Sequence, residues 1–155
     1  MKKKFLDAYM DTAKRFAELS TARRAKVGAI IVKDNRIVSI GYNGMPAGWN
    51  NECEEWEPLD GINFEVHEGD REIYGAYKTK PEVLHAESNA IAKMARSAES
   101  CEGATMFCTH LPCIECAKLI YQSGISHLYY DVEYEAAKGC GKEFLKQCGV
   151  AVIKL

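Results

Sequence analysis

Two short blocks of metal-binding residue types constrain how this chain can fold more than any other feature of its sequence. The blocks are His85-Ala86-Glu87 and Pro112-Cys113-Ile114-Glu115-Cys116. Two thiolates three positions apart at the start of a helix can converge on one ion, and the helix dipole favours their deprotonated form. An imidazole from a neighbouring helix supplies a third ligand. Three protein ligands leave the fourth position of tetrahedral zinc for water, as in catalytic sites.

Glu87 follows His85 by two positions. In a continuous helix this offset turns the Glu87 side chain about 200° away from the direction of His85. Near the start of a helix, however, its carboxyl group can still approach the water without being a ligand. A carboxyl group in that place can take a proton from the water and deliver it to a substrate.

Each block has an ordinary explanation when it is considered alone. A single Cys-x-x-Cys is also typical of a redox pair or of half of a structural zinc site, and a single His-x-Glu is usually an accident of the surface. Their order, the proline before the first cysteine, and a predicted helix after each block favour a shared metal site.

The chain has seven cysteines, an odd number that argues against a disulfide framework. We interpret Cys101, Cys108, Cys140 and Cys148 as buried small apolar residues.

Hydrophobic periodicity predicts an alternation of helices and strands along the chain. The first twenty residues form an amphipathic helix, and strands at 27–32 and 36–40 flank a tight turn at Asp34-Asn35. Further elements are a helix at 84–98, a strand at 104–109, a helix at 113–123, a strand at 127–130, a helix at 135–147 and a strand at 150–153. We expect long loops over 43–82, with at most a short helical piece.

This alternation predicts an α/β fold in which helices cover both faces of a mixed sheet. The 155 residues fit one domain, 1–155, because a single core of this size buries roughly 70% of the surface of the unfolded chain. No run of about 20 apolar residues is present to span a membrane, and no apolar signal sequence follows the basic start. We therefore expect a soluble cytoplasmic protein. The formal net charge of −2 makes nucleic acid a weak candidate partner.

A third block joins the two metal-binding blocks and extends the pattern over most of the chain. The three blocks are Gly41 to Gly48 (GYNGMPAG), His85 to Ile91 (HAESNAI) and Pro112 to Lys118 (PCIECAK). Together they resemble the deoxycytidylate (dCMP) deaminase family, a branch of the zinc-dependent cytidine deaminase superfamily, whose signature is His-x-Glu followed by Pro-Cys-x-x-Cys. The first block favours this branch over relatives that act on tRNA, guanine or free nucleosides. Alone, it would be interpreted as an ordinary turn after a strand.

The resemblance implies a hydrolase that converts dCMP to dUMP and ammonia in nucleotide biosynthesis, on a three-layer α-β-α cytidine-deaminase-like fold with roughly five strands. It implies that His85, Cys113 and Cys116 bind one catalytic zinc and that Glu87 transfers protons. It also implies that Asn43 contacts the sugar, that the Ala86 backbone meets the base and that Tyr134 lies near the substrate phosphate.

The same resemblance implies regulation and assembly. Family members are commonly hexamers that dCTP activates and dTTP inhibits, so we expect a homo-oligomer. The effector site is expected to include Lys26, Gly41, Tyr42, Asn43, Gly44, Met45, Gly48 and Arg96. Lys26 and Arg96 would contact the triphosphate, with Mg²⁺ as a candidate counterion.

Some family members bind a second zinc through additional cysteine and histidine residues. Cys53 and His67 lie in the appropriate loop region of this chain. The cysteine that the pattern requires before the first strand is absent, because the chain has Thr21-Ala22-Arg23 there. We therefore expect one catalytic zinc and no second ion.

Two other functions compete with dCMP deamination. A deaminase acting on another cytosine or adenine nucleotide, or on RNA or single-stranded DNA, would use the same metal site, although a polynucleotide substrate requires room for a flipped base and its flanking strand. The acidic 50–82 segment and the modest net charge argue against a polynucleotide. A structural zinc module would have a closed site and no reaction.

Overall fold

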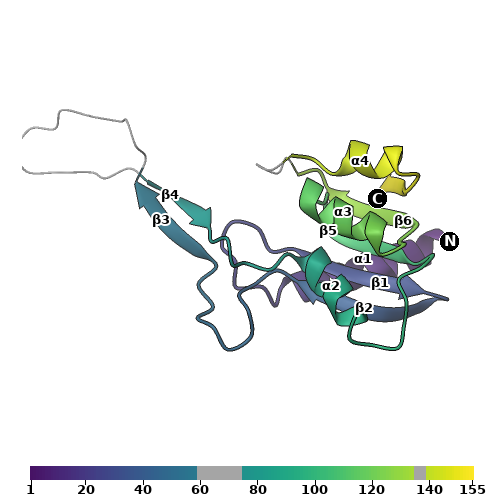
Figure 1. The fold of residues 1–155 in the computed structure, drawn as a ribbon, viewed down its shortest axis with the longest axis horizontal. Helices are drawn as coiled ribbons and strands as arrows, with labels where there is room; N and C mark the ends of the chain where they lie inside the picture. The colour runs from purple at the N-terminus through teal and green to yellow at the C-terminus, as the bar shows by residue number, and fades with distance from the viewer. Residues whose placement is uncertain (59–74, 135–138) are drawn as a thin grey trace, which may run out of the picture.

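A five-stranded mixed sheet forms the centre of the computed structural model, which describes residues 1–58, 75–134 and 139–155 (Figure 1). The strands, in the order β2-β1-β5-β6-β7, are β2 (Arg36–Tyr42), β1 (Gly28–Lys33), β5 (Thr105–His110), β6 (His127–Val132) and β7 (Ala151–Lys154). Strand β1 is antiparallel to β2 and β5, whereas β5, β6 and β7 run parallel. The predicted α/β fold with a mixed five-stranded sheet is confirmed.

Helices cover both faces of this sheet (Figure 1). They are α1 (Lys3–Ala17), α2 (Ala86–Met94), α3 (Ile114–Gln122) and α4 (Lys142–Gln147). Adjacent strand residues point to opposite faces, so Ile30 packs with Met10 and Ala13 of α1, while Ile31 lies in a core with the other three helices. The predicted three layers are therefore present. None of the described helices combines the length and the apolar character needed to cross a membrane.

The β1–β2 hairpin forms where the sequence predicts it. Lys33 pairs with Arg36, and the two residues between them, Asp34 and Asn35, have positive φ angles of 49° and 58°. Two consecutive residues in this region make the tight turn whose twist matches that of antiparallel strands. Short polar side chains such as those of Asp and Asn tolerate this backbone conformation better than most.

A two-stranded ribbon contradicts the prediction of long loops with a short helical piece at 43–82. Strands β3 (Glu54–Pro58) and β4 (Gly75–Thr79) pair in antiparallel register, and the ribbon extends away from the central sheet (Figure 1). Trp56 faces Tyr77 across the pair, and both side chains are exposed. Charged residues occur on both faces of the ribbon, so the alternation that identifies a half-buried strand is absent.

The ribbon is anchored to the segment before β1. The Glu54 carboxylate accepts hydrogen bonds from the backbone N–H groups of Arg23 and Arg24 at 3.0 to 3.2 Å. The Arg23 guanidinium donates to the Tyr77 hydroxyl at 3.2 Å.

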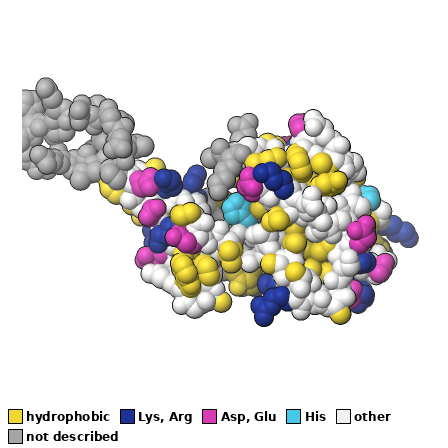
Figure 2. Space-filling model, in the orientation of Figure 1, with side chains coloured by type: hydrophobic (Ala, Val, Ile, Leu, Met, Phe, Trp, Pro, Cys, Tyr) yellow, Lys and Arg dark blue, Asp and Glu magenta, His cyan; other side chains and the backbone are white. Residues whose placement is uncertain are grey.

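On the face shown in Figure 2, basic and acidic side chains are interspersed.

The C-terminal helix is shorter than predicted. Helix α4 begins at Lys142, and residues 135–138 of the predicted helix lie outside the described residues. Gly139 has a φ of 102°, which is incompatible with a helix, and Gly141 packs against Ala117.

The four cysteines outside the metal-binding blocks differ in burial. Cys101 and Cys108 are buried, as predicted. The prediction that Cys140 is buried is wrong, because its side chain is exposed, and Cys148 is half-buried.

Close backbone contacts set the distance between the sheet and its helices. A Cβ atom on Gly41 of β2 would overlap the Ala86 carbonyl oxygen and lie 2.7 Å from the Ala90 nitrogen of α2. Gly28 of β1 has the same relation to Ala13 and Ala17 of α1. Because the obstructing atoms belong to helix backbone, they cannot rotate away as a flexible side chain would. Glycine at these positions therefore allows the helices to lie directly on the strands.

We predict that Gly41→Ala lowers the free energy of unfolding by about 1–3 kcal/mol, because α2 must shift to accommodate the added methyl group. Urea unfolding followed by circular dichroism measures the change. Gly44→Ala is the matched control, since a Cβ at that position meets no atom within 4 Å. Equal stability of the Gly41 and Gly44 variants would contradict the close-packing explanation.

Candidate metal centre and active site

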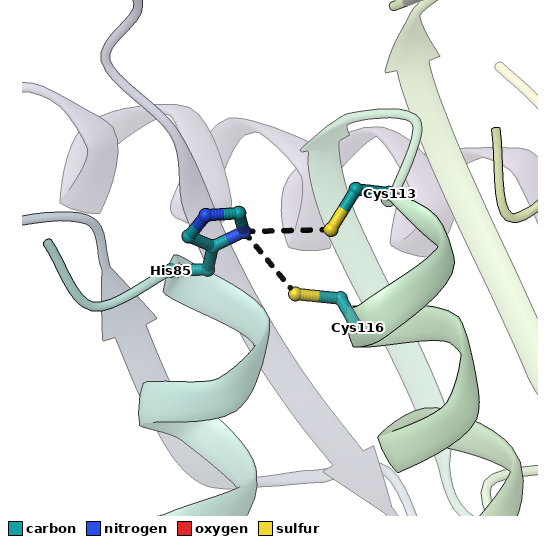
Figure 3. A group of neighbouring side chains, drawn as sticks. All are labelled: His85, Cys113 and Cys116. Carbon is teal, nitrogen blue, oxygen red and sulfur yellow. Dashed lines mark hydrogen bonds between the residues drawn. The ribbon is translucent and has the colours of Figure 1, made fainter. Parts of the chain in front are cut away.

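The starts of two helices bring three metal-binding side chains together (Figure 3). His85 is the residue before α2 and Cys113 the residue before α3, and both have extended backbone angles. Cys116 lies in the first turn of α3. The Nδ1 atom of His85 lies 3.6 Å from the Cys113 sulfur and 3.3 Å from the Cys116 sulfur. The structure thus gathers the three residues that the sequence predicts as ligands.

The donor set and its spacing fit one zinc ion. The three candidate ligand atoms all lie within 4.8 Å of one another. Usual Zn–S and Zn–N bond lengths in a tetrahedral site require ligand atoms roughly 3.5 to 3.8 Å apart. The His85–Cys113 separation of 3.6 Å meets this requirement, and the His85–Cys116 separation of 3.3 Å needs only a small adjustment. Imidazole nitrogen and two thiolates are also the donors that zinc prefers.

The two cysteine thiols lie close enough to shift each other's pKa in opposite directions. A hydrogen bond from Cys116, followed by the nearby His85, lowers the pKa of Cys113 to about 3. The same bond, together with burial and the neighbouring acidic groups, raises the pKa of Cys116 above that of an ordinary thiol. Ionisation of one sulfur therefore disfavours ionisation of the other, and a bound cation would compensate the charge of both. This behaviour suits a site that binds a metal ion.

Glu87 lies next to this centre in the first turn of α2, and its side chain is only 4% exposed. Burial is the main cause that raises the pKa of its carboxyl group, and hydrogen bonds to its own backbone and to Cys116 oppose this shift. The 200° offset of a continuous helix does not apply, because His85 has an extended backbone and is not part of the helix. The change of backbone conformation after residue 85 allows both side chains to reach one site.

The loop after β2 is held against the start of α2. Gly44 and Leu84 exchange two backbone hydrogen bonds of 3.1 and 2.9 Å, so the loop lies directly before His85. The Asn43 side chain accepts a hydrogen bond from the Val27 N–H and donates one to the Ala25 carbonyl, both at 2.8 Å. Asn43 therefore joins the end of β2 to the segment before β1. This position beside the metal centre agrees with the predicted sugar contact but does not test it.

Tyr134 follows β6 at the carboxyl edge of the sheet and is exposed. Its ring meets that of His110 edge-on, with centroids 6.1 Å apart. Because β5 and β6 are parallel, their carboxyl ends lie at the same edge, where Pro112 and Cys113 follow β5. The sequence analysis did not identify His110 as a candidate site residue. Its place at the end of a predicted strand, three residues before Cys113, is the feature of the sequence that could have identified it.

The predicted effector residues come from the loop after β2, the segment before β1 and the end of α2. Lys26 adjoins Val27 and so lies near the loop at 41–48, and both Lys26 and Arg96 are exposed. Arg96 follows the C-terminal end of α2, and the ammonium group of Lys93 in the last turn of this helix lies 5.9 Å from the centre of the Tyr42 ring. The effector site stays a prediction.

The residues considered for a second zinc are not brought together by the described structure. Cys53 is buried in a small cluster with Ala22, Val83 and Met45, and its sulfur lies 3.4 Å from the Thr21 hydroxyl. His67 lies outside the described residues. In the described part of the chain, the cluster of His85, Cys113 and Cys116 is the one group that offers three metal ligands.

Comparisons with known proteins agree with this geometry. A model of the cytidine and deoxycytidylate deaminase zinc-binding region matches residues 3–132. The deoxycytidylate deaminase of Enterobacteria phage T2 is 36% identical, over 84% of this chain and 81% of that protein. The human deoxycytidylate deaminase is 37% identical, over 79% of this chain and 61% of that protein.

A solved structure extends the similarity to nearly the whole length of both chains. The dCMP deaminase of cyanophage S-TIM5, in complex with dCMP and dUMP, is 42% identical and has a TM-score of 0.81. The comparison covers 100% of this chain and 99% of that chain. A structure from a study of tRNA:A34 deaminases, at 22% identity and a TM-score of 0.60, shares the fold.

We predict that Cys116→Ala loses most of its bound zinc, because a site with three protein ligands depends on each of them. Zinc per chain, measured by atomic emission after dialysis, is the readout. Cys148→Ala is the control, since Cys148 is a half-buried cysteine outside the cluster. A Cys116→Ala protein that retains one zinc per chain would disprove the ligand assignment.

Proposed function

The chain belongs to the cytidine and deoxycytidylate deaminase family, and on that premise we propose that it hydrolyses dCMP to dUMP and ammonia. The observation that carries this proposal is the buried carboxyl group of Glu87 beside a three-ligand zinc site. The full-length similarity to an S-TIM5 enzyme solved with dCMP and dUMP supports dCMP as the substrate.

Each residue of the centre has a separate task in this reaction. Zinc, when bound by His85, Cys113 and Cys116, supplies Lewis-acid activation of water for attack at C4 of cytosine. Glu87 accepts the proton that the attacking water loses. It delivers this proton to the ring nitrogen and then moves a second proton, from the hydroxyl group added at C4, to the departing amino group, so that ammonia leaves and the C4 carbonyl of dUMP remains. Burial, which raises the pKa of Glu87, helps its carboxyl group hold a proton between these steps.

The remainder of the substrate would lie along the edge of the sheet. The Ala86 backbone, which directly follows His85, would meet the base. Asn43 would bind the sugar from the neighbouring loop, where its amide is already held by Ala25 and Val27. Tyr134 would contact the phosphate from the end of β6.

Two alternative functions are less well supported. A polynucleotide deaminase needs a basic path for the strand, whereas basic and acidic side chains are interspersed on the visible face of the molecule (Figure 2). A structural zinc module has no use for a buried carboxyl group next to a three-ligand site. Zinc analysis combined with ammonia release from dCMP and from a cytosine-containing oligonucleotide distinguishes the three functions.

We also propose that the protein forms a homo-oligomer, a hexamer, which dCTP activates and dTTP inhibits. The support is the family resemblance together with the exposure of Lys26 and Arg96, whose positive charges suit a triphosphate. Mg²⁺ remains a candidate counterion at this site.

We predict that Glu87→Gln lowers dCMP turnover by about 10²- to 10⁴-fold, because glutamine cannot transfer protons. Zinc content is expected to remain that of the parent protein, since Glu87 is not a ligand. Ammonia release and zinc per chain are measured on the same samples, with Glu115→Gln as a control at an exposed carboxyl group of α3. Loss of zinc together with activity would show that the assigned role is wrong.

We predict that dTTP inhibits and dCTP activates turnover at sub-saturating dCMP, and that Arg96→Glu weakens both responses while zinc stays bound. The reason is that the guanidinium group pairs well with phosphate, and an effector acts only if it favours one state of the assembly. Titrations with each triphosphate measure the responses, and Lys4→Glu on α1 controls for reversal of an exposed charge. A parent enzyme that responds to neither nucleotide would remove the regulatory site but not the deaminase.

A further inference from the structure

His110 lies in the middle of the sheet edge that carries the metal centre. Its pairing partner on one side is Val132 of β6, two residues before Tyr134. On the other side Ala29 pairs with Cys108, so the antiparallel register places Val27 beyond β1 opposite His110. Val27 is the residue whose N–H donates to the Asn43 side chain. His110 thus lies between Asn43 and Tyr134.

The alternation of β5 directs the His110 side chain to the face of the metal centre. Met106 and Cys108 lie in the core beneath α2, α3 and α4, and His110 continues the same period-two series. The buried Cys108 is close enough to Glu87 and Cys113 that their charges raise the pKa of its thiol, after burial itself. The position two residues further along this face therefore lies on the same side of the sheet as the catalytic groups.

The imidazole of His110 is held by its neighbours. Its Nδ1 atom lies 3.0 Å from the Thr109 hydroxyl, which in turn accepts a hydrogen bond of 3.1 Å from the Gly28 N–H. A hydroxyl that accepts from Gly28 has its own hydrogen to donate to Nδ1, and this network favours the tautomer with a hydrogen on Nε2. Burial lowers the pKa of His110, although the Asp131 carboxylate opposes the shift. The half-buried ring is therefore a neutral donor held in one orientation.

We propose that His110 is a substrate-binding residue that donates its Nε2–H to the 5′-phosphate of the nucleotide. This inference rests on the proposed function, which puts the base at zinc and the sugar at Asn43. The phosphate then lies further along the edge, toward the His110 and Tyr134 rings that meet edge-on. His110 and Tyr134 together would distinguish a nucleoside monophosphate from the corresponding nucleoside.

The test compares the parent with His110→Leu, which removes the donor at similar volume, and His110→Gln, which retains an N–H near the position of Nε2. A hydrogen bond to a charged phosphate is worth about 10- to 100-fold in affinity. We expect His110→Leu to lower kcat/KM for dCMP by about this factor, mainly through KM, and to leave deoxycytidine turnover within about twofold of the parent. We expect His110→Gln to recover part of the loss.

Binding of dUMP, measured by calorimetry in the same variants, provides a second readout that does not depend on turnover. His127→Leu is the matched control, because the Nδ1 atom of His127 also lies close to the hydroxyl of the preceding residue, Ser126, at 2.9 Å. His127 is exposed at the amino end of β6, the opposite edge of the sheet. We expect dUMP affinity to fall about 10-fold or more in His110→Leu and to be unchanged in His127→Leu.

Three results would overturn the assignment. Unchanged dUMP affinity in His110→Leu would show that the ring does not contact the phosphate. Equal losses for dCMP and deoxycytidine, with zinc content and thermal stability intact, would move the contact to the base or sugar. Equal losses in His110→Leu and His127→Leu would indicate a general structural effect. A parent that binds dUMP but releases no ammonia from dCMP would instead refute the proposed function and leave the phosphate contact standing.

Discussion

The meeting of two helix N-termini at one cation is the constraint on which the rest of this site depends. His85 and Cys113 precede α2 and α3 in extended conformation, and Cys116 follows in the first turn of α3. Two thiolates so close together repel each other because they carry the same charge. A bound zinc ion removes that repulsion, and the positive ends of the helix dipoles reduce it further. The ligands, the neighbouring Glu87 and the Ala86 backbone therefore occupy one small volume.

Small residues allow the scaffold to hold this arrangement. Gly41 permits α2 to lie on β2. Ala86 and Ala90 of α2 and Ala117 of α3 are fully buried between the helices and the sheet. The paired backbone of Gly44 and Leu84 then ties the loop after β2 to the residue before His85. The same contacts that pack the helices on the sheet thus position the loop after β2 relative to the cluster of His85, Cys113 and Cys116.

The direction of the strands decides which side chains share the edge of the sheet. Parallel β5 and β6 end together, so Tyr134 meets His110 close to the segment that leads to Cys113. The antiparallel β1 begins at this edge, which brings Val27 and Asn43 to the same place. A nucleotide that spans base, sugar and phosphate can therefore contact residues that lie far apart in the sequence.

The sequence by itself determined the cluster of His85, Cys113 and Cys116, the acidic residue Glu87 beside it and the α/β class, because residue type and short spacing are enough to specify a group of metal-binding side chains and amphipathic elements. It also determined the β1–β2 turn, since Asp34 and Asn35 suit positive φ angles.

Only the tertiary structure decided features that depend on distant partners. Strands β3 and β4 pair across residues 59–74 and lack a local apolar alternation. The approach of Glu87 to the ligands depends on the extended backbone of His85, and the place of His110 depends on strand register. Local periodicity cannot predict pairing between segments that are far apart in the chain. The pattern within one segment indicates which of its faces is buried, but it does not identify the segment that pairs with it.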